Sequence, residues 1–154
     1  MIRKAVYVDV DQMVMLGKRA HAKSDWAQFP FNDIDARMFA VTAITEKTMC
    51  CYVSENNGKF DGLLIGIEQS MPFNKRIKSA TDYFTYSARR GVADALIKAF
   101  MHWALEHRRV DEVVMMASQL RSAKWMDSLL TGNGLTPIGH GYIKQIIKRG
   151  GANV

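Results

Sequence analysis

Residues 76–118 constrain the fold most, because they contain a strand, a long helix and a second strand in immediate succession. Residues 76–87 are rich in aromatic residues and threonine, which is typical of a strand. In residues 87–109 apolar side chains recur at helical spacing, and residues 110–118 form an apolar run without alternation, as in a strand covered on both faces. A strand, helix and strand at this spacing predict a parallel, right-handed βαβ crossover.

The first part of the chain predicts one short strand and two helices. Residues 4–8 are β-branched and aromatic, as in a strand, and Asp9 with Gln12 forms a capping-box pattern for the helix that follows. A second helix is expected to begin near Asn32 or Asp33. The apolar side of this second helix is expected to carry Ile34, Met38, Val41 and either Ile44 or Thr45.

Three strands are expected between this helix and the crossover. Residues 49–55 and 60–68 are apolar runs on either side of a turn sequence at 55–59, and residues 76–87 follow closely. Parallel pairing needs a long connection between strands, and these links are short. The sheet is therefore expected to be antiparallel up to residue 87.

The end of the chain predicts one more helix and the completion of the sheet. Residues 122–130 have a helical pattern that ends at Gly132 or Gly134. Residues 135–138 and 142–147 are expected to be strands. The fold class is therefore α/β (α+β), with a mixed, mostly antiparallel sheet, a central βαβ crossover and helices on both faces.

Composition indicates one folded domain with a basic surface. The chain has 154 residues, 48% of them hydrophobic, which is too apolar for a disordered protein, and it shows no repeat or linker. We expect a single domain over residues 1–150 and a tail over 151–154. The formal charge of +6 favours a phosphate-bearing cofactor, nucleic acid or an anionic surface as partner, or is a solvated surface without a partner.

Several classes of protein are not expected from this sequence. No apolar run approaches the roughly 18 residues of a membrane helix, and acidic residues stand where a secretory signal would be apolar, so we expect a cytoplasmic protein without a membrane partner. Cys50 and Cys51 are adjacent, so reduced thiols on the two faces of a strand are expected. The histidines have no metal-ligand spacing with the cysteines, so no metal site is expected.

The turn before the long helix has the composition of an anion-binding site. Small residues at Gly91 and Ala93 let a ligand approach the main chain, and the free amides of a first helical turn point outward with the positive end of the helix dipole. Arg89 and Arg90 are placed to add charge-assisted hydrogen bonds to the same anion. Alternatively, Gly91 and Ala93 only permit close packing of helix on sheet.

Over nearly its whole length the chain resembles the GCN5-related N-acetyltransferases, the GNAT family. Residues 80–118 are similar to the acyl-CoA motif of that family, in which a strand ends in an Arg-rich turn, Gly-x-Gly or Gly-x-Ala follows, and a long helix leads to the next strand. The Trp103–Ala104 pair, and Tyr142 with Lys144, resemble compact members encoded by tailed bacteriophages.

The resemblance implies direct transfer of an acetyl group from acetyl-CoA to an amine on a small molecule or a protein, and family habit implies a homodimer. The strands at 81–87 and 110–118 would separate beyond their paired portion, with the pantetheine on the first and the pyrophosphate at the start of the long helix. The residues implied to bind acetyl-CoA are Phe84, Thr85, Tyr86, Arg89, Arg90, Gly91, Val92, Ala93 and Asp94.

The reaction needs a base and an acid. An amine with a pKa near 10.4 costs about 4 to 5 kcal/mol to present neutral at pH 7, which a base must offset. Asp82 and Glu68, on strands expected to face the cleft, are the candidate bases; otherwise both are solvated carboxylates at a strand edge. Tyr142 and His140 are candidate acids that lie near the last expected strand.

Two departures from the family pattern leave a second function open. Family members usually carry Arg or Gln where this chain has Ala88, and many carry a Tyr that protonates the departing thiolate where it has Leu130. The alternative is a non-catalytic protein of the same fold that binds nucleic acid or a protein partner. Trp26, Phe29 and Phe31 lie where the family forms its acceptor wall, or are tucked onto the core.

Overall fold

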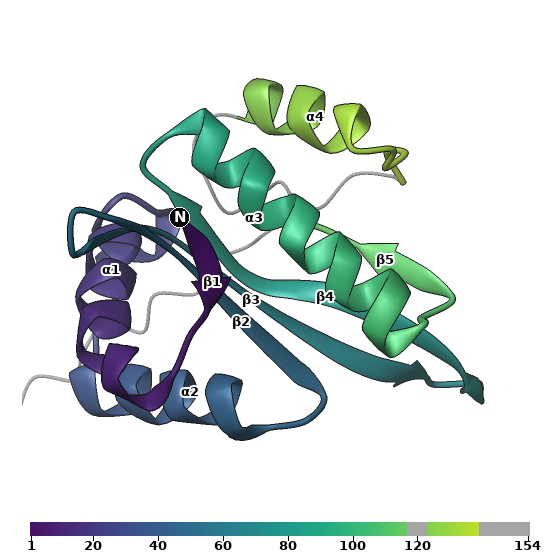
Figure 1. Cartoon of the computed structure of the whole chain (residues 1–154), viewed down its shortest axis with the longest axis horizontal. Coiled ribbons are helices and arrows are strands. Elements are labelled where there is room, and N and C mark those ends of the chain that lie inside the picture. Colours follow the sequence, from purple (N-terminus) through teal and green to yellow (C-terminus); the bar gives the residue numbers. More distant parts are fainter. Residues whose placement is uncertain (117–122, 139–154) are drawn as a thin grey trace, which may run out of the picture.

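A five-stranded sheet in the order β1-β2-β3-β4-β5 forms the central layer of the computed structural model (Figure 1), which describes residues 1–116 and 123–138. The strands are β1 (Ile2–Lys4), β2 (Met49–Asn56), β3 (Lys59–Met71), β4 (Asn74–Ser87) and β5 (Glu112–Val114). The helices are α1 (Val10–Ala22), α2 (Asp33–Thr45), α3 (Arg90–His102) and α4 (Ala123–Gly132). Short helical turns are η1 (Tyr7–Asp9), η2 (Asp25–Gln28) and the π-helical η3 (Trp103–Arg108).

The topology confirms the expected mixed α/β fold and its crossover. Strands β1 to β4 pair antiparallel, whereas β5 pairs parallel with β4 after the chain has crossed the sheet in α3. Helices α1 and α2 cover one face of the sheet and α3 covers the other, with α4 beside α3 (Figure 1). Each face has its own apolar cluster, one with α1 and α2 and one with α3, η3 and α4.

The hairpin between β2 and β3 turns as its sequence predicts. Asn57 and Gly58 have φ values of 50° and 73°, the left-handed conformation that a tight hairpin turn needs at both central positions. Further along, the thiols of Cys50 and Cys51 are free, and the two residues belong to opposite apolar clusters, as expected. Burial raises the pKa of each thiol to about 12, so neither is a reactive thiolate.

Two glycines on β3 bring α3 into direct contact with the sheet. A Cβ atom at Gly62 would lie 2.4 Å from the Val92 side chain, and one at Gly66 would lie 2.3 Å from the Phe100 ring. Both distances are far below contact between carbon atoms, so only glycine allows this approach. The Phe100 side chain is fully buried as a result.

The N-terminal strand is displaced from its predicted position at residues 4–8. Strand β1 ends at Lys4, and the chain then enters η1. The predicted capping box is also wrong, because Asp9 does not cap α1. Its carboxylate instead accepts hydrogen bonds from the Arg3 guanidinium at 2.7 and 2.9 Å and from the Val6 amide at 2.8 Å, which fixes β1 to the start of α1.

Helix α2 begins as predicted, and its buried face agrees with the prediction in part. Its N-cap is Asn32, whose side chain accepts from two backbone amides of the first turn. Half of the predicted apolar side faces outward, since Ile34 is 70% and Met38 is 64% exposed, whereas Val41 and Ile44 pack against the core as expected. The helix also places Ala40 and Ala43 against the core, because small side chains let it lie close to α1 and the sheet.

The end of the chain differs from expectation at one segment. Residues 135–138 are not a strand and follow Gly134, whose φ of 86° ends the turn after α4. The expected strand at 142–147 and the end of the expected domain lie outside the described residues. Within the described part of the chain, no helix has the length and apolar character that crossing a bilayer requires.

Candidate active site

Strands β4 and β5 pair over only three residues, and a side chain stands where the pairing stops. The parallel ladder joins Ser79–Thr81 to Glu112–Val114. Beyond it, the backbone amide of Met116 donates to Oδ1 of Asp82 at 2.9 Å, in place of a carbonyl on β4. The Thr85 hydroxyl donates to the other carboxylate oxygen at 2.9 Å. Asp82 therefore marks the point where the two strands separate.

The environment of Asp82 suits a group that exchanges a proton near neutral pH. Its side chain is buried, and burial raises the pKa of the carboxyl to about 6, although the hydrogen bonds from Met116 and Thr85 oppose this shift. A base with a pKa close to the working pH is the most effective one. Desolvation beside two donors thus leaves Asp82 able to accept a proton.

A β-bulge lies directly after Asp82. Gly66 of β3 faces Asp82 and Ile65 faces Phe84, so Tyr83 is an extra residue on β4. The Tyr83 ring turns toward α2 and packs against Phe39, with the ring centroids 5.1 Å apart. The bulge brings β4 residues 83–85 to the wall of a cavity on this face of the sheet.

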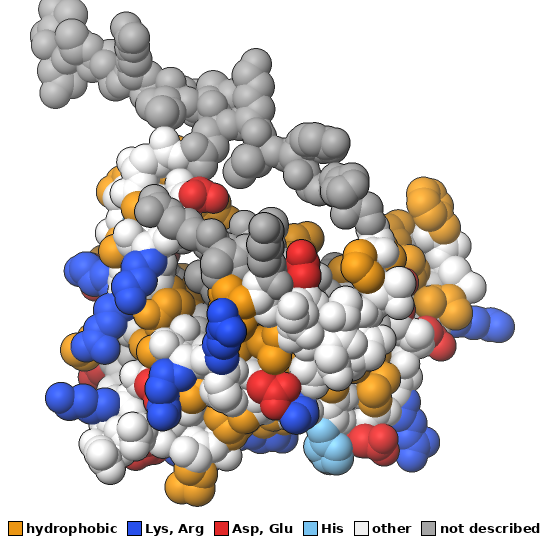
Figure 2. Space-filling model, turned by 90° about the horizontal axis from the view of Figure 1, so that it is seen from above, with side chains coloured by type: hydrophobic (Ala, Val, Ile, Leu, Met, Phe, Trp, Pro, Cys, Tyr) orange, Lys and Arg blue, Asp and Glu red, His pale blue; other side chains and the backbone are white. Residues whose placement is uncertain are grey.

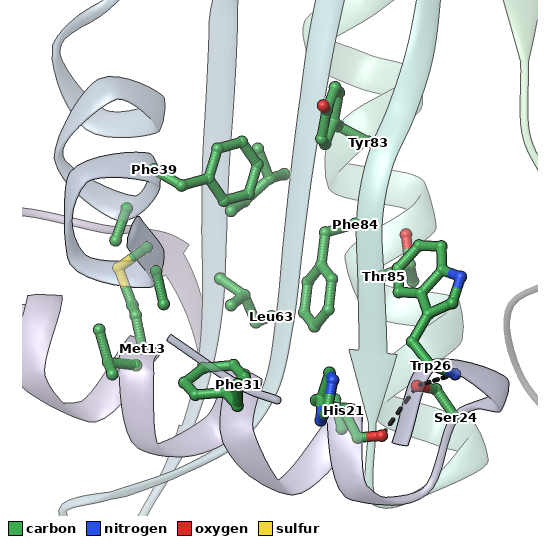
Figure 3. Close-up of a pocket in the computed structure, with 16 residues that line it drawn as sticks. Met13, His21, Ser24, Trp26, Phe31, Phe39, Leu63, Tyr83, Phe84 and Thr85 are labelled. Carbon is green, nitrogen blue, oxygen red and sulfur yellow. Dashed lines mark hydrogen bonds between the residues drawn. The ribbon is translucent and has the colours of Figure 1, made fainter. Parts of the chain in front are cut away.

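The cavity, of about 260 Å³, lies between α1, α2 and the β3–β4 pair. Figure 3 shows Phe84 and Leu63 directed into it from the sheet, with Phe31 and His21 opposite them and Trp26 beside Ser24 at one end. Almost all of its wall is apolar. The residues that line it are Met13, Val14, Gly17, Ala20, His21, Ser24, Trp26, Phe31, Ala36, Phe39, Ala40, Leu63, Ile65, Tyr83, Phe84 and Thr85.

The N-terminus of α3 offers unpartnered amides at the other end of β4. Arg89 is the N-cap residue and provides no side-chain cap, and within the described ranges the amides of Arg90, Gly91 and Val92 have no hydrogen-bond partner. A Cβ atom at Gly91 would meet nothing within 4 Å. Gly91 is therefore not needed for packing, and open space lies over the exposed amides.

The expected anion site is narrower than residues 90–94. The Ala93 amide donates to the Arg89 carbonyl at 3.2 Å, and Asp94 lies one residue further into the helix, so neither amide is available. The Asp94 carboxylate accepts from Lys98 at 2.6 Å and from Asn133 at 3.0 Å, contacts that lower its pKa. Asp94 and Ala93 therefore stabilise α3 and its contact with the end of α4. The candidate anion site, called the seat below, consists of the three amides before them, those of Arg90, Gly91 and Val92.

Both arginines of the turn already have partners. The Arg89 guanidinium donates to Asp61 at 2.5 Å, and the carbonyl of Asp61 accepts from the amide of Ala88 at 2.9 Å, so β3 fixes the turn. The Arg90 guanidinium lies over the ring of Trp125 in α4, 6.0 Å from its centroid. Both side chains stay at least partly exposed, at the mouth of the seat.

Comparison with solved structures identifies this arrangement of strands and helices. The sequence matches no protein-family model and no curated protein sequence. A protein from Clostridium acetobutylicum, described as a predicted acetyltransferase and solved with acetyl-CoA, superposes with a TM-score of 0.71 at 14% identity, covering 94% of this chain and 95% of that one. The chain has the fold of the GCN5-related N-acetyltransferases.

Other proteins of the GNAT fold give the same result. A ribosomal-protein-alanine N-acetyltransferase from Brucella melitensis biovar Abortus has a TM-score of 0.65 at 15% identity, covering 95% of this chain and 99% of that one. An aminoglycoside 6'-N-acetyltransferase from Acinetobacter haemolyticus has a TM-score of 0.68 at 13% identity, covering 96% and 99%.

Glu68, the second expected base, lies on the α3 face of this GNAT fold and is held in ion pairs. Arg108 of η3 and Lys78 of β4 both donate to its carboxylate, Lys78 at 2.9 Å. The hydrogen bond from Arg108 is the main reason that its pKa lies below the usual value. Glu68 is thus a fixed anion between η3 and the sheet, a poorer proton acceptor than Asp82.

The expected acids and the aromatic loop have different outcomes. Tyr142 and His140 lie outside the described residues. Leu130, which replaces the usual Tyr of the GNAT pattern, is buried in the apolar cluster of α3 and α4. Of the loop aromatics, Trp26 and Phe31 line the cavity, whereas Phe29 is 40% exposed and does not.

Sequence reasoning missed the neighbours that define the environment of Asp82. Nothing in the sequence marked Met116 as the donor at the strand separation, because its contribution is a backbone amide. Thr85 was expected to bind acetyl-CoA, and its hydroxyl instead contacts the Asp82 carboxylate. The spacing of three residues between Asp82 and Thr85 was the one sequence signal for a contact between their side chains.

Proposed function

We propose that the protein transfers an acetyl group from acetyl-CoA to a primary amine. The observation that carries this proposal is the combination of two features that β4 connects. One is the buried Asp82 carboxylate at the β4–β5 separation, and the other is the three amides at the start of α3 that have no partner among the described residues. The main chain of Phe84, Thr85 and Tyr86 runs between these two features and is where we place the pantetheine arm.

The amides of Arg90, Gly91 and Val92 would receive the pyrophosphate, which needs close approach to the main chain and a positive local potential. The open space at Gly91 and the positive end of the α3 dipole supply both. Arg89 and Arg90 flank this seat and would add charge-assisted hydrogen bonds after partial release from Asp61 and Trp125.

In the transfer, a bond forms between the amine nitrogen and the acyl carbon, and the bond from that carbon to sulfur breaks with its electron pair leaving on sulfur. Asp82 would take the proton that the amine must lose, directly or through water. Its raised pKa of about 6 matches this role better than the lowered pKa of Glu68. The thiolate leaves as a thiol once it is protonated, and Tyr142 or His140 stays the proposed donor.

Acetyl-CoA binding tests the proposal most directly. A ligand at 100 times its dissociation constant stabilises a fold by about 2.7 kcal/mol, so acetyl-CoA is expected to raise the melting temperature by several degrees. Transfer is then measured as CoA thiol release that depends on added amine. A melting temperature that does not respond to millimolar acetyl-CoA would refute the transferase.

A second candidate is a non-catalytic protein of this fold, and the observation in its favour is the buried Leu130 in place of a hydroxyl-bearing acid. Such a protein would use its charge of +6 to bind nucleic acid. On the face shown in Figure 2, Lys and Arg side chains lie at several separate places, with acidic side chains near some of them. Tight, steeply salt-dependent binding to DNA or RNA, without acetyl-CoA binding, would support this alternative.

A further inference from the structure

The cavity between α1, α2 and the β3–β4 pair has a chemistry that selects among amine acceptors. We propose that it receives the apolar group of the acceptor, so that the substrate is a primary amine with one aromatic ring or branched alkyl group and not a polycationic amine. This inference rests on the proposed acetyl transfer and deepens it, by naming the class of acceptor.

None of the described residues that line the cavity carries a carboxylate. Within the part of the wall that the structure describes, the residues with polar side-chain atoms are His21, Ser24, Trp26, Tyr83 and Thr85, and the Ser24 hydroxyl already donates to the His21 carbonyl at 2.8 Å. A polyamine or aminoglycoside brings several ammonium groups, each of which needs an anionic or hydrogen-bonding partner when it leaves water. An apolar group needs none and gains free energy from burial.

The positive charges around the cavity act against a second ammonium group. Lys18 lies over the Phe31 ring, 5.8 Å from its centroid, and Lys23 approaches the Tyr86 hydroxyl at 3.5 Å. Asp33 is the acidic partner of Lys18, at 3.3 Å, and is largely exposed. A polycation entering this end would thus meet lysines, whereas a monoamine with an apolar group would place only its ring there.

The size of the cavity sets an upper limit on the group that it can enclose. An engineered apolar cavity of about 150 Å³ binds benzene, whereas pockets that enclose drug-sized ligands begin near 300 Å³. At about 260 Å³, the cavity can hold one ring with a short linker. A molecule of three linked sugars would not be enclosed.

The proposed base lies on the side of β4 that faces α3, because Asp82 pairs with Gly66 and a Cβ atom at Gly66 would point at Phe100. Thr85 is part of the cavity wall, but its side chain lies on the α3 side of β4, with that of its partner Leu64, and there donates to Asp82 at 2.9 Å. A ring seated between Phe31 and Phe84 (Figure 3) would direct an amine on a short linker along β4, and the amine would reach Asp82 by passing between β4 and β5 beyond their paired residues. The apolar group would thereby orient the nitrogen toward the β4–β5 separation, where we place the thioester.

The test compares amines with acetyl-CoA held constant. We expect 2-phenylethylamine and 3-methylbutylamine to give kcat/KM values at least about 10-fold above those of spermidine and kanamycin, measured by CoA thiol release. In the variant Ala36→Phe, an added ring occupies the cavity, so KM for 2-phenylethylamine is expected to rise at least about 10-fold with acetyl-CoA binding unchanged. The control Met38→Phe adds the same ring on the exposed side of α2 and is expected to change neither value.

A readout that does not depend on turnover is the effect of 2-phenylethylamine on the melting temperature. We expect the amine to raise it in the wild type and in Met38→Phe but not in Ala36→Phe. Preference for spermidine or kanamycin would overturn the inference and leave the transferase standing. It would also be overturned if phenylacetyl-CoA were preferred to acetyl-CoA and Ala36→Phe removed that preference, since the cavity would then hold the acyl group. Failure to bind acetyl-CoA would contradict both the proposed acetyltransferase function and this inference about the acceptor.

Discussion

The carboxylate of Asp82 accepts a 2.9 Å hydrogen bond from the backbone amide of Met116, across the point where β4 and β5 stop pairing. The side chain thus takes the place of a ladder carbonyl and satisfies the amide that lies two residues beyond the last paired residue of β5. The same carboxylate is the proposed base, so the residue that ends the strand pairing would also act on the substrate.

Asp82→Asn is expected to reduce turnover by about 100-fold or more while leaving acetyl-CoA affinity nearly unchanged, because Asn keeps an acceptor for Met116 but cannot take a proton. Amine-dependent thiol release and a thermal shift with acetyl-CoA measure the two quantities. In the wild type, kcat is expected to rise through a pH near 6, the pKa of Asp82, and this rise should be missing in the variant.

The same substitution is expected to change how stability depends on pH. The folded-state pKa of Asp82 is raised from 3.8 to about 6, so ionisation of this group costs the fold nothing below pH 3.8 and at most about 3 kcal/mol above pH 6. As the pH rises from 4 to 6, the wild type should therefore lose stability that Asp82→Asn keeps, so the free energy of unfolding of the variant should rise relative to that of the wild type. Urea denaturation at several pH values measures the difference, and parallel curves would contradict the shift.

Gly91→Leu is expected to weaken acetyl-CoA binding at least about 10-fold without destabilising the fold. The new side chain meets no protein atom near its Cβ but projects into the space over the α3 amides. Calorimetry measures the affinity, and chemical denaturation measures the stability. His102→Leu, at the opposite end of α3, is the control and should bind acetyl-CoA as the wild type does. Unchanged affinity in Gly91→Leu would exclude this seat.

Glu68→Gln is expected to destabilise the fold by about 1 to 3 kcal/mol, because it leaves Arg108 and Lys78 without their buried anion. The pKa of Glu68 is lowered, so its stabilising contribution is complete above about pH 4.5 and is lost as the pH falls further. The exposed Glu106→Gln on η3 is the control. A large loss of turnover with unchanged stability would instead make Glu68 the base.

Gly66→Ala is expected to lower the free energy of unfolding by about 2 kcal/mol or more, since the added methyl group would overlap the buried Phe100 ring. Gly91→Ala, where nothing lies near the Cβ, should leave stability unchanged or raise it slightly. Thermal or urea denaturation of the two variants compares them, and equal stabilities would contradict the close contact between α3 and β3.

The sequence predicted the elements whose local signals agree with their tertiary environment. The aromatic strand, the periodic long helix and the Asn57–Gly58 turn each carry a local pattern, and each is in the structure. The apolar side of α2 was predicted only in part, because Ile34 and Met38 face outward while two alanines face inward, and hydrophobic periodicity gives more weight to large side chains.

The candidate site was predicted in part for a comparable reason. The turn at Gly91 and the carboxylate of Asp82 can be found in the sequence, because glycine and aspartate have distinct chemistry. The bulge at Tyr83 and the cavity depend on register and on the packing of three elements, to which no short pattern corresponds. The partners of Glu68 likewise come from η3 and β4, 40 and 10 residues away in the sequence.

The two β3 glycines have a consequence for ligand capture. The Val92 and Phe100 side chains pack directly on the backbone at Gly62 and Gly66, where no Cβ atom stands in the way. Helix α3 therefore cannot shift along the sheet without losing both contacts at once. The proposed phosphate-binding end of α3 would then already be in place before a ligand binds, and it would not need to close around the ligand. The amides at the start of α3 would already have the orientation that binding needs, so little ordering of the main chain would accompany coenzyme binding.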